Sequence, residues 1–209
     1  MNKLILPILL LTSTFVFGQA GYERALVRGI QMVKTAKAPE DMNRAEAFFE
    51  QIAKTEQNQW LPYYYAAYAK ILTGYLYETA NKDYIAQKAE SMIQKADSLQ
   101  PDNSEICCLK HMAASLAFQA DPANRWLSYG MEAKTTLEKA KQLDPSNPRP
   151  YVLEGFQLMN APEEYGGNKQ KAKIAFQKAI ALFEKFKPSS EVAPSWGLEQ
   201  AEDAMKNLK

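Results

Sequence analysis

Hydrophobic residues recur at helical spacing along almost the whole chain after residue 21. In the segment 22–36, for example, Ala25, Ile30 and Val33 follow a rough helical period. The same pattern predicts helices at 22–36, 38–56, 60–78, 83–100, 104–119, 121–143, 149–160, 168–186 and 193–208. No segment alternates apolar and polar residues between hairpin turns, as a half-buried strand would. The sequence therefore predicts an all-α fold.

Proline and short polar residues mark several of the predicted helix starts. Pro39 and Pro122 suit the first helical position, where a backbone N–H has no partner within the helix. Asp121 and Asn168 are each the first residue of a predicted helical segment, so we expect their side chains to cap it.

One internal pattern repeats along the chain. An alanine is followed at offset 4 by a large apolar residue and at offset 7 by a second residue that is usually alanine. The copies are Ala89-Ile93-Ala96, Ala133-Leu137-Ala140, Ala172-Phe176-Ala179 and, less strictly, Ala45-Phe49-Ile52. Two copies continue to a proline at offset 12, Pro101 and Pro145. Small alanines let one helix lie close to another, and the proline ends the helix.

These copies resemble the second helix of tetratricopeptide (TPR) repeats. The first helix of the repeat is represented by Tyr63 and Ala67 before one copy and by Tyr151 and Gly155 before another. The resemblance covers roughly residues 21–190. Successive copies lie 44, 44 and 39 residues apart, against about 34 in a TPR unit, so the helices or loops must be longer.

The resemblance implies both an architecture and a binding face. The expected fold is a single domain, residues 21–209, in which about four TPR-like helix hairpins form a right-handed superhelical stack. The segment 193–208 is the expected C-terminal capping helix. In TPR proteins the first helices line a concave groove, which implies a binding face made of Tyr64, Tyr68, Leu72, Cys108, Met112, Arg149, Phe156 and Met159. Aromatic and methionine side chains suit peptide recognition.

We therefore predict a non-enzymatic, exported scaffold that binds a protein or peptide through its concave face. A periplasmic small-molecule binder or transport accessory protein is the alternative. The same side chains could instead be core, or the terminal helix could fill the groove.

Residues 161–180 raise the question of what a double glycine does. Gly166 and Gly167 precede a strongly helical run, but a phosphate-binding loop would also need a preceding strand and a Lys-Ser/Thr ending. The stretch resembles a connector of TPR-like proteins, including the periplasmic accessory component of TRAP-type transporters. We predict a hinge in which glycine supplies a positive φ and Tyr165 packs the turn down.

The N-terminal residues differ from the rest of the chain. Residues 1–20 carry one positive charge, Lys3, then an apolar run, then the small residues Gly18 and Ala20. This pattern is typical of a secretory signal peptide, with an uncleaved anchor as the alternative. We predict export, to the periplasm or beyond, and no membrane insertion after cleavage. Without Lys3 the chain has 24 basic and 24 acidic residues, which does not favour nucleic acid as a partner.

Few residues offer chemistry. Cys107 and His111 are four residues apart and share a helix face, but a metal site needs more ligands and the chain has one histidine. Cys107 and Cys108 are adjacent, so we expect free thiols, together with a partly exposed histidine. Glu163 and Glu164 are neighbours in a loop and do not converge on one point. We predict no catalytic residue, no metal and no cofactor.

Overall fold

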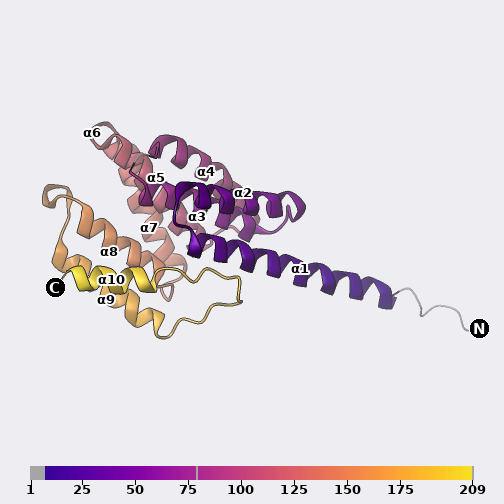
Figure 1. The fold of residues 1–209 in the computed structure, drawn as a ribbon. Coiled ribbons are helices and arrows are strands. Elements are labelled where there is room, and N and C mark those ends of the chain that lie inside the picture. The colour runs from indigo at the N-terminus through magenta and orange to yellow at the C-terminus, as the bar shows by residue number, and fades with distance from the viewer. Residues whose placement is uncertain (1–7, 79, 209) are drawn as a thin grey trace, which may run out of the picture.

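The computed structural model describes residues 8–78 and 80–208, which Figure 1 shows as a stack of helices. The helices are α1 (Ile8–Thr35), α2 (Pro39–Thr55), α3 (Trp60–Leu76), α4 (Lys82–Leu99), α5 (Ser104–Ala120), α6 (Pro122–Arg125), α7 (Met131–Leu143), α8 (Arg149–Asn160), α9 (Lys169–Phe183) and α10 (Leu198–Asn207). A π-helix, η1 (Trp126–Gly130), and a 3-10 helix, η2 (Glu163–Tyr165), complete them. The described residues contain no strand, so the predicted all-α class is confirmed.

Neighbouring helices pack as hairpins, α1 with α2, α3 with α4, α5 with α7, and α8 with α9. The repeated alanines lie at these contacts: Ala45, Ala89 and Ala172 have no exposed surface. In the last hairpin a Cβ on Gly155 would lie 2.5 Å from the ring of Phe176. Glycine at this position therefore lets α8 lie against that ring.

The helix predicted for 121–143 is interrupted. Pro122 begins α6 as expected, but the π-helix η1 separates α6 from α7. Asp121 stands at the N-cap position without capping the backbone, because its carboxylate accepts hydrogen bonds from Nδ2 of Asn124 at 3.0 and 3.1 Å. Asn168, in contrast, caps α9 as predicted, and its Oδ1 accepts a hydrogen bond of 2.8 Å from the backbone N–H of Lys171.

Residues 184–197, which we call the strap, have no regular secondary structure and join α9 to α10. The helix predicted for 168–186 thus ends at Phe183, and the predicted capping helix begins at Leu198 instead of residue 193. The strap reaches back toward the N-terminal helices before it returns to α10 (Figure 1). The cap α10 packs on α9 and α8 and buries Ala201 and Ala204.

The predicted signal peptide, residues 1–20, lies in part outside the described residues, and its cleavage stays a prediction. Among the helices of residues 8–78 and 80–208, none is both long enough and apolar enough to cross a membrane.

Candidate functional site

The residues predicted to form a concave binding face lie on α3, α5 and α8, the first helices of their hairpins. Tyr64, Tyr68, Cys108, Met112 and Arg149 are buried, and Leu72, Phe156 and Met159 are half-buried. The ring of Phe156 lies edge-on to that of Phe176, with centroids 5.1 Å apart. A binding role for the eight residues stays a prediction.

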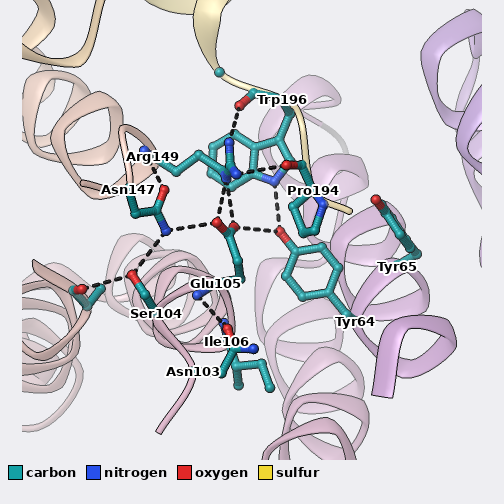
Figure 2. A network of polar contacts seen from close by, with 12 residues as sticks. Tyr64, Tyr65, Asn103, Ser104, Glu105, Ile106, Asn147, Arg149, Pro194 and Trp196 are labelled. Atoms are coloured by element: carbon teal, nitrogen blue, oxygen red, sulfur yellow. Dashed lines mark hydrogen bonds and ion pairs between the residues drawn. The ribbon is translucent and has the colours of Figure 1, made fainter. Parts of the chain in front are cut away.

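The strap covers the α3 part of this face. The hydroxyl of Tyr65 donates a 2.8 Å hydrogen bond to the carbonyl of Val192, which is buried. The indole of Trp196 stacks on Tyr68 with centroids 5.3 Å apart, and its Nε1 donates to the hydroxyl of Tyr64 at 2.8 Å. The chain's own strap therefore covers the predicted binding face at Tyr64 and Tyr68, and Figure 2 shows its contact with Tyr64.

A buried ion pair holds the strap in place. Arg149, which is 1% exposed, donates from Nε to both carboxylate oxygens of Glu105 at 2.7 and 2.8 Å. Its Nη2 donates to the carbonyl of Pro194 at 2.7 Å, and its Nη1 donates to that of Trp196 at 3.5 Å (Figure 2). Burial raises the pKa of Glu105, and the charge of Arg149 opposes this rise. The pair therefore links α5 and α8 to the strap.

Further partners satisfy the rest of this network. Nδ2 of Asn147 donates to Glu105 at 2.8 Å and to the hydroxyl of Ser104 at 3.0 Å. The Ser104 hydroxyl in turn donates to the carbonyl of Ala140 at 2.8 Å (Figure 2). Because each charged or polar group here has a partner within the chain, the network is suited to holding structure rather than to binding an ion.

The only histidine is buried, not partly exposed as expected. His111 is 3% exposed, and its Nδ1 lies 2.8 Å from the carbonyl oxygen of Ala133, so Nδ1 carries the proton and donates it. Burial lowers the pKa of His111 to about 4. Cys107 and Cys108 are free and buried, and burial raises the pKa of both thiols. Among the described residues, no three His, Cys, Asp or Glu side chains gather as a metal site would require.

Exposed aromatic and aliphatic side chains gather at the turns of the last two hairpins. We call this group the tip patch: Trp126, Leu127, Tyr129, Met131 and Tyr165. Leu127 is 84% exposed and Tyr165 is 62% exposed. The α6–η1 end and the α8–α9 turn lie on the same side of the molecule, at the left in Figure 1. Exposed apolar patches, where they are contiguous, mark interaction or ligand-binding sites.

The π-helix η1 presents one half of the tip patch. Arg125 anchors its start, because the guanidinium pairs with the carboxylate of Asp83 and donates to the carbonyl of Ala117 at 2.9 Å. Gly130 lies beneath the indole of Trp126, where a Cβ would come within 2.9 Å of the ring. π-helical turns occur frequently at functional sites, because they turn side chains out of the ordinary helical register.

The double glycine presents the other half. Gly166 adopts φ +90°, which confirms the predicted positive φ. A Cβ on Gly167 would lie 1.8 Å from the carbonyl oxygen of Ala161, so only glycine fits this turn. The prediction that Tyr165 packs the turn down is wrong, because its side chain remains largely exposed.

Trp126 and Tyr165 meet across the two turns. Their ring centroids are 6.5 Å apart and their planes are inclined by 42°. A flat apolar molecule could enter between the two rings only if one of them turned until the rings were parallel. The sequence analysis did not single out the residues of η1. The adjacent Trp126 and Leu127 were an available signal, because two consecutive large apolar residues cannot both face the core from one helix.

The comparisons with known proteins agree with this architecture. No protein-family model matches the chain, and no curated protein matches it either. The HusA haemophore from Porphyromonas gingivalis has a similar structure, with a TM-score of 0.80 and 34% sequence identity over 90% of this chain and 92% of that one. A thermophilic TPR protein from Thermus thermophilus is similar in fold, with a TM-score of 0.63 and 16% identity over 90% of this chain and 80% of its own. The predicted TPR-like stack is thereby confirmed, whereas the TRAP-type connector stays a prediction.

Proposed function

The chain belongs to the family of the HusA haemophore, and from this premise we propose that it binds a haem-type porphyrin on the tip patch. A haemophore is a binding protein and not an enzyme, which supports a binding role for this relative of HusA. Export, which residues 1–20 predict, would suit a protein that captures haem outside the cytoplasm.

The observation that carries the proposal is the neighbouring pair of exposed rings, Trp126 and Tyr165. A porphyrin is flat and mainly apolar, and atoms in contact with each of its faces lie about 3.5 Å away. To hold a porphyrin, the two rings must be parallel and about twice this distance apart. The side chain of Tyr165 is 62% exposed, so it is the ring with room to turn. Leu127 and Met131 add exposed apolar surface beside the pair.

The chain's histidine does not take part in this mode of binding. The ring of His111 is buried, and its Nδ1 donates to the carbonyl of Ala133. Contact with the faces and edges of the macrocycle therefore supplies the affinity.

A haem titration of the full chain, followed by Soret absorbance, tests the proposal. We expect the double variant Trp126→Ala/Tyr165→Ala to weaken binding by about fivefold or more, since loss of two stacking contacts amounts to roughly 1–3 kcal/mol. Ile174→Ala is the matched control, because Ile174 is 57% exposed and lies outside the tip patch. Equal affinities of the double variant and the wild type would contradict the proposed site.

The protein or peptide binding predicted for the concave face is a second candidate, and it requires the strap to leave. The hydrogen bonds from Arg149 and the stacking of Trp196 on Tyr68 oppose that movement. The alternative prediction from the sequence is a small-molecule binder, and a small molecule can bind at the tip patch without displacing the strap.

A further inference from the structure

A cavity lies away from the tip patch, at the opposite ends of the hairpins. Its volume is about 680 Å³, within the range of roughly 300–1,000 Å³ common for small-molecule sites. Its lining comes from the start of α3, the turns before α5 and α8, the end of α9 and the strap. We call it the strap cleft.

The inner lining of the strap cleft carries no free charge. Glu105 and Arg149 line it, but they bind each other and the strap carbonyls. Asn147 and Ser104 line it too, and their side chains are hydrogen-bonded within the same network. An ion placed against this surface would find every charged group already compensated, so an uncharged part of a ligand fits there best.

Apolar side chains supply the body of the strap cleft. Trp60 and Leu61 contribute from α3, and Leu182 and Phe186 contribute from the end of α9 and the strap. All four are half-buried, and the Arg149 guanidinium lies 4.6 Å from the centroid of the Phe186 ring. Half-buried aromatic walls of this kind contact flat or chain-like apolar molecules.

The rim carries more positive than negative charge. Lys185 and Lys187 line the strap cleft and are exposed, and neither forms an ion pair with another described residue. Of the two acidic residues at the rim, Asp102 pairs with Lys139 at 3.0 Å. Asp144 accepts hydrogen bonds from the backbone N–H and hydroxyl of Ser146 and keeps its negative charge, so the two lysines leave a net excess of one positive charge.

We propose that the strap cleft binds a small amphipathic anion, with an apolar body held beside Trp60 and Phe186 and one acidic group held at the rim by Lys185 and Lys187. This site is separate from the tip patch, and it does not depend on the chain binding porphyrin.

Two fluorescent dyes that share one aromatic body test both parts of this proposal. 8-Anilinonaphthalene-1-sulfonate carries an acidic group, and N-phenyl-1-naphthylamine is its uncharged counterpart. With the full chain, we expect Trp60→Ala to weaken binding of both dyes. Lys185→Gln/Lys187→Gln should weaken the binding of the sulfonate dye alone, by about threefold or more, since each exposed ion pair contributes up to roughly 1 kcal/mol. The tip variant Trp126→Ala/Tyr165→Ala should leave both affinities unchanged.

The opposite results would overturn the proposal. If the lysine variant bound the sulfonate dye as tightly as the wild type, Lys185 and Lys187 would not hold an acidic group and the ligand would not be an anion. Dye binding that survives Trp60→Ala, or that disappears in the tip variant, would place the dyes outside the strap cleft. The lysine variant changes only exposed side chains, so it serves even if Trp60→Ala misfolds. Haem titrations of the same variants test the two proposals separately, because failure of haem to bind the wild type would refute the proposed function and leave the strap-cleft proposal standing.

Discussion

At the scale of single residues, His111 makes stability depend on pH. Its pKa is about 4 in the folded protein, against an ordinary value of 6.5 that holds in the unfolded chain. Between pH 4 and pH 6.5, the unfolded chain therefore binds the proton more readily than the folded protein. Stability should therefore fall as pH falls through this window, by about 2 kcal/mol between pH 7 and pH 5. Urea unfolding at the two pH values measures this loss.

His111→Gln is the control for that measurement, because an amide can still donate to the carbonyl of Ala133 but does not titrate. We expect its stability to change less between pH 7 and pH 5 than that of the wild type. Parallel changes in the two proteins would assign the acid sensitivity to other groups.

The buried pair of Arg149 and Glu105 gives a second prediction at this scale. Arg149→Met would leave the carboxylate of Glu105 uncompensated in the interior and should destabilise the fold by about 3–5 kcal/mol in urea unfolding. The double variant Glu105→Gln/Arg149→Met removes both charges, so it should be more stable than Arg149→Met alone. A double variant that is no more stable would mean that the Arg149 contacts to the strap, and not the charge, dominate the effect.

At the scale of elements, the turn between α8 and α9 controls one half of the tip patch. Gly167→Ala would force the turn away from the carbonyl of Ala161, because the new Cβ would overlap that oxygen. We expect displacement of Tyr165 and weaker haem binding with little change in helix content. Gly166→Ala is the comparison: no atom lies within 4 Å of its Cβ position, so its effect is limited to backbone strain at φ +90°. Full haem affinity in Gly167→Ala would show that the turn does not position Tyr165.

The sequence predicted those elements whose contacts are local. Alanines at offsets 0 and 7 predicted the hairpins, because close helix packing requires small side chains at regular spacing. The strap could not be predicted in this way, since its hydrogen bonds join residues 45 to 132 positions apart and follow no period. The tip patch was missed for a related reason: a π-helix within 121–143 changes the register, so the side chains of η1 left the face that a continuous helix would give them.

At the scale of the whole molecule, the strap changes how the stack holds together. In a solenoid each repeat contacts only its neighbours, so the ends can open separately. Here the described core has two clusters, one that includes α3 and one formed by α8, α9 and α10 around Phe176. Val192 belongs to the first cluster, although the strap joins α9 to α10 of the second. The strap should therefore couple the opening of both clusters.

Hydrogen exchange measures this coupling directly. In the wild type we expect amides of α3 and α9 to exchange with similar opening free energies. Tyr65→Phe/Trp196→Ala removes the hydrogen bond to Val192 and the stacking on Tyr68, so the α8–α10 cluster should open more readily than α3. Ile174→Ala keeps the strap contacts and should leave the two rates close together. Equal acceleration in α3 and α9 would mean that the strap adds stability but is not what couples the two clusters.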